Sequence, residues 1–164
     1  MKKIILIIFA VLAGISIAFA RETKAKENLP QYFIEGIQGT AAQGTYNVKI
    51  TIVSKKANDV TDDMLARCAV HGVLFKGFGN VQSRTQQKPL AGSAAAEASH
   101  ADFFESFFKP GGTAVNYAQT VQSSRTTVKS GKEYKVSSIV TVNKEQLRKD
   151  LESADIIRGL NSIF

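Results

Sequence analysis

Two short segments of the chain hold side chains that could act as a nucleophile and a base. The first is Cys68-Ala69-Val70-His71, a thiol followed three residues later by an imidazole. A catalytic cysteine needs a base and an exposed, electropositive setting. Cys68 instead falls on the apolar stripe of a predicted helix, with His71 near the edge of that stripe. We therefore expect a buried, inert thiol, as free cysteines are among the most buried residues.

The second segment, Ser99-His100-Ala101-Asp102, has the three groups of a catalytic triad in a row. A triad needs its base between the nucleophile and the carboxylate in space, which residues at one helix start do not normally provide. Helix capping explains the pattern without catalysis, with Ser99 as N-cap and Asp102 at the third helical position. We assign no catalytic residue, and keep as an alternative a hydrolase that uses His100 or Cys68 with partners elsewhere in the chain.

Metal and cofactor sites are not predicted. A structural zinc site needs about four ligands, whereas this chain has one cysteine and two histidines. The glycines of Gly72–Gly79 lack the Gly-Lys-Ser/Thr ending of a phosphate loop, and no G-x-G-x-x-G motif occurs. A single cysteine also excludes an intramolecular disulfide.

An aromatic stripe is the most unusual feature of the sequence. Its members are Phe103, Phe104, Phe107 and Phe108. The favoured interpretation is that this face of an amphipathic helix packs in the core. The alternative is an exposed patch for a partner or an apolar ligand. As candidate binding residues we name these four phenylalanines together with Arg84 and Lys88, which lie in a polar segment, Gln82–Pro89, predicted to be an exposed loop.

The first 20 residues have the pattern of a secretory signal peptide. Met1-Lys2-Lys3 is followed by an apolar run and then by Ala18-Phe19-Ala20, a small-x-small cleavage site. We expect cleavage after Ala20 and a periplasmic or secreted protein that does not span the membrane afterwards. Residues 21–31 are polar and aperiodic, which predicts a flexible lead-in to a single domain over residues 32–164.

The charge of the chain favours anionic partners. The net charge is +7, and about +5 without the signal peptide, since 19 basic residues then face 14 acidic ones. The basic residues are scattered and include no dense arginine cluster, so we expect no nucleic-acid partner. An anionic ligand of the cell envelope, or an envelope protein, is the expected partner.

Alternation of apolar and polar residues predicts about four strands. The clearest is Thr45–Lys55, where Tyr46, Val48, Ile50 and Ile52 alternate with polar residues. The other candidates are Tyr32–Ile37, Thr113 to about Val128, and Glu133–Val142. A turn at Ser130-Gly131 joins the last two as a hairpin. Alternation of this kind is typical of an antiparallel sheet with one covered face.

Three helices are expected between and after these strands. Thr61 caps the first, which carries Cys68 and ends at Gly77-Phe78-Gly79-Asn80; the second carries the aromatic stripe; and Asn143 caps the last, with Gln146 at its third position. The order is β-β-α-α-β-β-α. We predict an α+β domain, an antiparallel sheet with helices packed on one face.

Two segments of the chain resemble a known group of proteins. They are Arg67–Phe75, and Tyr134-Lys135-Val136 leading into Val140–Leu147. Both are similar to small exported proteins of Bacteroides-type gut bacteria to which no function is assigned. The resemblance implies a Gram-negative envelope setting and no particular activity.

The expected function is that of an exported, non-enzymatic binding or assembly module of the bacterial cell envelope. The pattern that favours it is a well-formed domain without a cluster of convergent polar residues. Two alternatives stay open, the hydrolase described above and an oligomeric structural protein whose aromatic stripe forms the subunit contact. If the chain is an enzyme, its cysteine and histidines should meet in a cleft.

Overall fold

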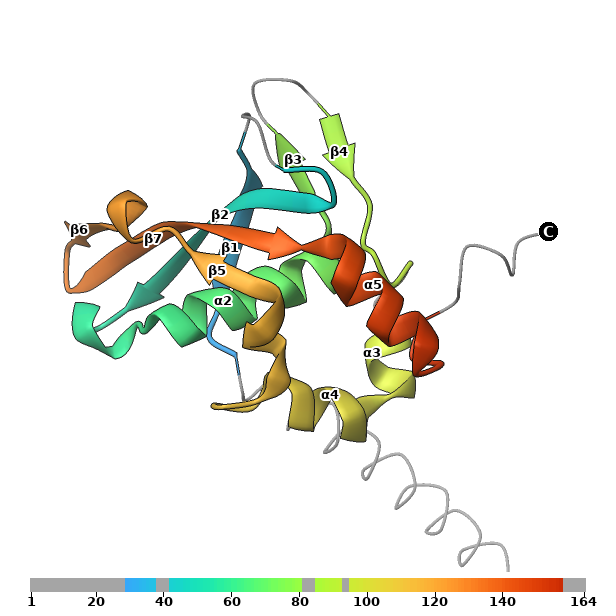
Figure 1. The fold of residues 1–164 in the computed structure, drawn as a ribbon. Helices are drawn as coiled ribbons and strands as arrows, with labels where there is room; N and C mark the ends of the chain where they lie inside the picture. Colours follow the sequence, from blue (N-terminus) through green and yellow to red (C-terminus); the bar gives the residue numbers. More distant parts are fainter. Residues whose placement is uncertain (1–28, 38–41, 81–84, 93–94, 158–164) are drawn as a thin grey trace, which may run out of the picture.

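The computed structural model describes residues 29–37, 42–80, 85–92 and 95–157 (Figure 1). The predicted signal peptide, most of the lead-in and Arg84 lie outside these residues. Within them the fold is α+β, as predicted. None of the helices in this part of the chain is long and apolar enough to cross a membrane.

The main sheet is antiparallel throughout. β1 (Tyr32–Gly36) pairs with β2 (Thr45–Ser54), and β2 pairs with β7 (Glu133–Asn143). The far edge of β7 is shared by β5 (Ala118–Thr120) and β6 (Thr126–Ser130). The alternation predicted for β2 is confirmed, because Val48, Ile50 and Ile52 are fully buried and the residues between them are partly exposed.

Helix α2 (Asp62–His71) lies against the buried face of this sheet. Its start is the predicted one, since the Thr61 hydroxyl oxygen accepts a hydrogen bond from the Met64 N–H at 3.2 Å. The helix continues into a π-helical turn, Gly72–Lys76, and ends at Gly77. Gly72 permits a close approach to β1, because a Cβ there would lie 2.5 Å from Cδ1 of Ile34.

A second, two-stranded sheet follows, which the sequence did not predict. β3 (Phe78–Asn80) pairs antiparallel with β4 (Thr85–Gln87). β4 lies inside Gln82–Pro89, the segment that was expected to be an exposed loop. Three-residue strands are too short to show a period of two in the sequence. The predicted loop is therefore wrong for residues 85–87.

Two short helices, α3 (Ala95–Ser99) and α4 (Ala101–Phe108), come next. The predicted cap of α4 is wrong: its N-cap is His100 and not Ser99, and no side chain caps it. The Ser99 hydroxyl instead donates to the carbonyl oxygen of Ala95 at 3.0 Å, which completes the last turn of α3. At the other end of α4, the buried Arg67 donates from Nη1 to the Phe108 carbonyl oxygen at 2.9 Å.

The single long strand predicted over residues 113–128 is divided into four pieces. A 3-10 helix (Thr113–Tyr117), β5, a second 3-10 turn (Gln122–Ser124) and β6 follow one another. The second turn is held at the start of α2, because Gln122 Nε2 and Arg125 Nη1 both donate hydrogen bonds to the Asp62 carboxylate, at 2.5 and 2.7 Å. The interruption therefore has a long-range cause.

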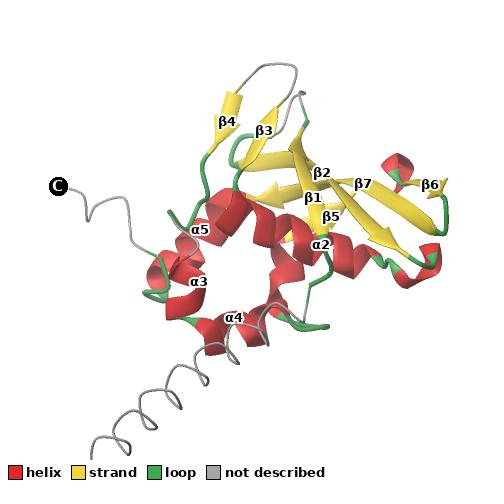
Figure 2. Cartoon of the chain, turned by 180° about the vertical axis from the view of Figure 1, so that it is seen from behind, coloured by secondary structure: helices red, strands yellow, loops and turns green. Residues whose placement is uncertain are grey.

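Helix α5 (Lys144–Ser153) follows β7 directly. The predicted cap is confirmed, since Asn143 Oδ1 accepts from the Gln146 N–H at 3.1 Å. Leu147 and Leu151 are buried. Figure 2 shows the strands grouped on one side, α3, α4 and α5 gathered on the other, and α2 between them.

Candidate functional site

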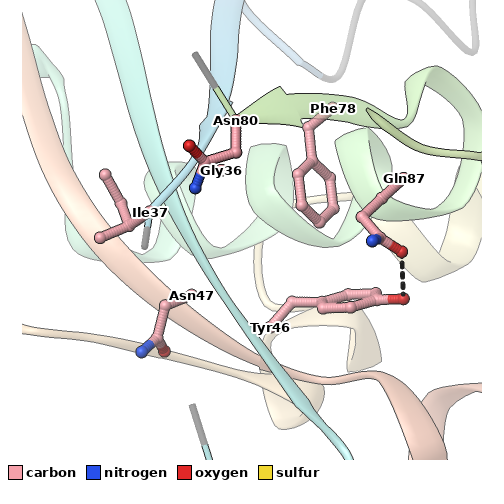
Figure 3. A pocket seen from close by; sticks show the side chains of 7 residues that line it. All are labelled: Gly36, Ile37, Tyr46, Asn47, Phe78, Asn80 and Gln87. Carbon is pink, nitrogen blue, oxygen red and sulfur yellow. Dashed lines mark hydrogen bonds between the residues drawn. The ribbon is translucent and has the colours of Figure 1, made fainter. Parts of the chain in front are cut away.

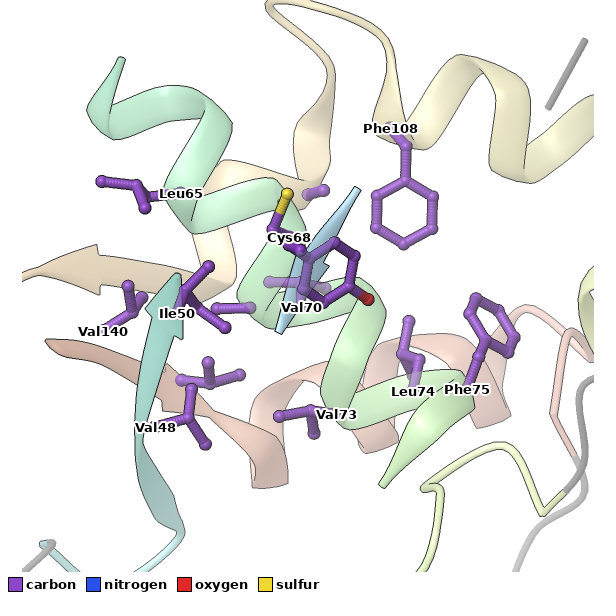
Figure 4. Close-up of a cluster of buried hydrophobic side chains, with 14 of the residues drawn as sticks. Val48, Ile50, Leu65, Cys68, Val70, Val73, Leu74, Phe75, Phe108 and Val140 are labelled. Atoms are coloured by element: carbon purple, nitrogen blue, oxygen red, sulfur yellow. The ribbon is translucent and has the colours of Figure 1, made fainter. Parts of the chain in front are cut away.

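The thiol of Cys68 is enclosed by the core. The residue is fully buried on α2, and Figure 4 shows it among apolar side chains such as Leu65 and Ile50. Burial raises the pKa of the Cys68 thiol to about 12, and the nearby charges of Arg67 and Lys76 lower it by less. The thiol therefore stays protonated at neutral pH, which is the form that neither attacks carbonyls nor binds metals.

His71 sits at the end of α2 with both ring nitrogens occupied. The phenolic oxygen of Tyr32 on β1 lies 2.5 Å from Nδ1, and Oε1 of Glu97 on α3 lies 3.1 Å from Nε2. Phe75 and Phe108 contact the imidazole edge to face, with ring centroids 5.2 and 5.3 Å away. One side chain thus joins three segments that are distant in sequence.

The order of these groups assigns a tautomer to the imidazole. A carboxylate only accepts, so Nε2–H of His71 donates to Glu97, and Nδ1 accepts from the Tyr32 hydroxyl. Hydroxyl, imidazole and carboxylate therefore follow one another in space in the same order as in a catalytic triad. The hydroxyl belongs, however, to a tyrosine that is only 5% exposed. Burial is the main cause that raises the pKa of Tyr32, and the nearby Cys68 and Glu97 raise it further. Both effects disfavour a nucleophilic phenolate.

A lysine covers the same tyrosine. Nζ of Lys76 lies 3.7 Å from the centroid of the Tyr32 ring and 3.5 Å from the Tyr32 carbonyl oxygen. Partial burial lowers the pKa of Lys76. The contact fits a cation held on the face of an aromatic ring, and it adds a further tie between β1 and the end of the α2 segment.

The second predicted segment does not assemble. Ser99 is engaged with Ala95, as described above, and His100 is half-buried at the start of α4. In the described part of the chain, no hydrogen bond or ion pair joins His100 to Cys68 or His71. The described residues also include no group of three or more His, Cys, Asp or Glu side chains that could hold a metal ion.

The aromatic stripe lies mostly in the core. Phe104, Phe107 and Phe108 are buried and contact one another, and Phe104 and Phe108 also contact Phe75. This is the first of the two interpretations drawn from the sequence. Only Phe103 is half-exposed, which leaves little of the stripe for a partner. Of the two basic candidates, Lys88 is exposed just after β4, and Arg84 lies outside the described residues.

A small open cleft lies where the end of β1 and the start of β2 meet the second sheet. Its volume is about 150 Å³, and its lining consists of Gly36, Ile37, Tyr46, Asn47, Phe78, Asn80 and Gln87. Figure 3 shows the rings of Tyr46 and Phe78 next to each other, with Asn80, Ile37 and Asn47 across from them.

Two aromatic rings form the apolar part of this cleft. Tyr46 and Phe78 meet edge to face with their centroids 5.1 Å apart. The Tyr46 hydroxyl donates to Oε1 of Gln87 at 3.0 Å, which fixes the ring against β4. Nζ of Lys144, in the first turn of α5, lies 4.2 Å from the Tyr46 ring centroid. The ring is thus held from two sides before any ligand arrives.

The polar part of the cleft comes from three carboxamides, those of Asn47, Asn80 and Gln87. Oδ1 of Asn47 accepts from the Thr141 hydroxyl at 2.9 Å. That bond leaves the Asn47 amide N–H groups pointing away from Thr141 as donors.

Sequence reasoning missed the cleft because its residues are spread over four segments. Tyr46 was assigned only to the apolar face of β2, and Phe78 only to the end of a helix. The one available signal was an aromatic residue placed directly after the helix stop at Gly77, where a chain that simply turned would not need one. Comparisons with protein-family models, with curated proteins and with solved structures found no match.

Proposed function

We propose that this chain is an exported, non-enzymatic binding module of the bacterial cell envelope, and that its ligand enters the cleft lined by Tyr46, Phe78, Asn80 and Gln87. One observation carries the proposal: two fixed aromatic rings and three carboxamides border the same open cleft. Binding sites commonly combine an apolar surface with a few polar groups that orient the ligand.

The lining favours an uncharged polar ligand. None of the seven lining residues carries a charge, and the nearby ammonium of Lys144 is engaged with the Tyr46 ring, 4.2 Å from its centroid. A charged ligand would therefore lose hydration without a lining residue as counter-ion. Carboxamides both donate and accept hydrogen bonds, which suits hydroxyl and amide groups. A volume of about 150 Å³ is below the roughly 300–1,000 Å³ of pockets that enclose drug-sized ligands. The cleft therefore suits one unit of a longer chain, such as one sugar ring.

The hydrolase alternative has less support. Cys68 is protonated and enclosed, and the nitrogens of His71 are already occupied by Tyr32 and Glu97. His100 has no acidic or hydroxyl partner among the described residues. The oligomer alternative also has less support, since three of the four phenylalanines that would form its subunit contact are buried within this chain.

Nuclear magnetic resonance titration tests the proposal. The protein, purified after export and labelled with nitrogen-15, is titrated with glucose and with N-acetylglucosamine as uncharged probes, and with glucuronate as a charged one. We expect amide shifts at Gly36, Asn47 and Asn80 with the uncharged probes, and weaker ones with glucuronate. Shifts scattered over the surface, or none with any probe, would count against a ligand site in this cleft.

A matched pair of variants sharpens the test. Gln87→Ala removes a carboxamide that lines the cleft and holds Tyr46, so we expect the probe affinity to fall severalfold. Asn116→Ala removes an exposed carboxamide from the 3-10 helix before β5, away from the cleft, and should leave the affinity unchanged. Equal affinities for the two variants would show that the cleft does not hold the probe.

A further inference from the structure

Two exposed apolar side chains lie on the two edge strands β1 and β6, toward one end of the outer face of the main sheet. Among the described residues, Phe33 is 58% and Val128 59% exposed, more than any other large hydrophobic side chain. The register places Phe33 opposite Thr51, and Val128 opposite Lys135, which in turn lies opposite Val53. Since neighbouring strands in register share faces, Phe33, Val53 and Val128 point to the same side of the sheet.

Five exposed lysines surround the same end. β2 ends beside the start of β7, where Ser54 faces Tyr134, and the β6–β7 turn lies next to it. Figure 1 shows this turn and the end of β2 on the same side of the molecule. The lysines are Lys55, Lys56, Lys129, Lys132 and Lys135. The exposed acidic residues near them in sequence are Asp59 and Glu133, and Glu35 is exposed on the outer face two residues from Phe33. We call these five lysines, with Phe33 and Val128, the lysine tip.

We propose that the lysine tip docks on an anionic phospholipid surface, with Phe33 and Val128 entering the interface. Lys135 lies on the same face of the sheet as Val128, and the other lysines face the phosphates from around the strand ends. The proposal goes beyond the binding function of the cleft and does not depend on it. The cleft lies at the opposite end of β2, near Tyr46 and Asn47, so a docked molecule would present it away from the lipid.

Charge complementarity alone would fit any polyanion, but the composition of the tip favours lipid. A bilayer interface accepts exposed apolar side chains such as Phe33 and Val128, whereas the charged groups of a polyanion offer them no apolar surface. The cations of the tip are all lysines, and the lysine ammonium acts as a compact point charge rather than a two-pronged partner for one phosphate. Lysines near an anionic bilayer each strengthen binding by about fivefold.

Vesicle sedimentation tests the proposal on the protein purified after export. The probes are vesicles of phosphatidylcholine alone and of phosphatidylcholine mixed with phosphatidylglycerol. We expect binding to the mixed vesicles only, and a steep loss of binding as salt is raised, because salt screens charges at a surface. Equal binding to both vesicles, or no binding to either at low salt, overturns the proposal.

Charge-matched variants locate the surface. The combined substitution Lys129→Gln, Lys132→Gln, Lys135→Gln should weaken binding to mixed vesicles by roughly a hundredfold, at about fivefold per lysine. All three positions are exposed, so the fold should be kept, which circular dichroism verifies.

The control changes three exposed lysines elsewhere, as Lys88→Gln, Lys109→Gln, Lys149→Gln, and removes the same net charge. It should retain most of the binding. If this control loses as much affinity as the tip variant, net charge and not the lysine tip causes binding, and the proposal fails.

A second pair of measurements separates a lipid from a soluble polyanion. Phe33→Ser and Val128→Ser should each weaken binding to mixed vesicles severalfold, and leave binding to dextran sulfate unchanged. If both variants bind vesicles as the unaltered protein does, the apolar side chains do not enter the interface. The tip is then a general polyanion site, and the assignment to lipid is overturned.

Discussion

The phenolic oxygen of Tyr32 and Nδ1 of His71 lie 2.5 Å apart, although 39 positions separate the two residues. Through the other ring nitrogen, at 3.1 Å from Glu97, the same imidazole reaches α3. β1, α2 and α3 are thus joined by polar bonds beside an aromatic core. Partly buried polar groups of this kind are costly when they lose a partner, because water cannot replace it fully.

Tyr32→Phe should therefore lower the free energy of unfolding by about 1–3 kcal/mol. The ring and its packing are kept, and only the hydroxyl that Nδ1 of His71 needs is removed. Urea denaturation followed by circular dichroism measures the change. Tyr134→Phe is the matched control, since Tyr134 is half-exposed and its hydroxyl makes no hydrogen bond within the described residues. Equal stabilities for Tyr32→Phe and the control would mean that the Tyr32–His71 bond contributes nothing.

Cys68 should resist thiol reagents in the folded protein. Its thiol is fully buried, so a reagent cannot reach it. Burial also raises its pKa to about 12, so almost none of the reactive thiolate is present at neutral pH. We expect reaction with Ellman's reagent at pH 8 to be slow, at a rate that follows unfolding. In guanidinium chloride the same thiol should react at once, which serves as the control. Rapid, complete labelling of the native protein would contradict the buried position.

Elements governed by local patterns could be predicted from the sequence. The alternation of Val48, Ile50 and Ile52 placed β2, and Thr61 and Asn143 marked the starts of α2 and α5. Each of these signals is contained in a few neighbouring residues, so no knowledge of the tertiary structure is needed to recognise them.

Features that depend on distant partners could not be predicted. The break between β5 and β6 is stabilised by Arg125, which binds Asp62 from 63 positions away. His71 was a candidate only for chemistry with Cys68, because nothing in its neighbourhood reveals Tyr32 or Glu97. The cleft escaped notice for the same reason, since Tyr46 and Gln87 meet across 41 positions.

Gly77 should be the most sensitive of the glycines that the structure describes. It has φ of 66°, where side chains are strained, and a Cβ would lie 2.4 Å from the Gln87 carbonyl oxygen on the neighbouring strand segment. Gly77→Ala should destabilise the protein by more than about 1 kcal/mol and displace β4, since a backbone atom cannot move aside cheaply.

Gly92→Ala is the matched control for this substitution. Gly92 has φ of 78°, but an added Cβ would meet nothing within 4 Å, so only the backbone strain is introduced. Thermal unfolding compares the two variants. Because Gln87 lines the cleft, Gly77→Ala should also weaken binding of the uncharged probes. A smaller loss of stability for Gly77→Ala than for Gly92→Ala would show that β4 does not pack against Gly77.

The protein should lose stability in alkali. The pKa values of Cys68, Tyr32 and Tyr117 are all raised in the folded state, in each case chiefly by burial, and for Tyr117 also by its hydrogen bond to Asp150. Below about pH 8, under the ordinary pKa of a thiol, both states keep these protons, and the stabilisation is fully present. As the pH rises further, the unfolded chain ionises first, so the free energy of unfolding falls until the folded groups ionise too. Lys76, whose pKa is lowered by partial burial, offsets part of this loss.

Urea denaturation at a series of pH values from 8 to about 11 measures this loss, to which Cys68 contributes on the order of a few kcal/mol by about pH 11. Cys68→Ala provides the control. It lowers stability at every pH by leaving a small cavity, but it removes one of the ionising groups, so the stability should fall less steeply with pH. The two proteins are compared by how steeply the free energy of unfolding falls with pH, and not by its absolute value. Parallel curves for the two proteins would mean that the Cys68 thiol ionises equally well in the folded and unfolded chains, contrary to its enclosure by Leu65, Ile50 and the rest of the core.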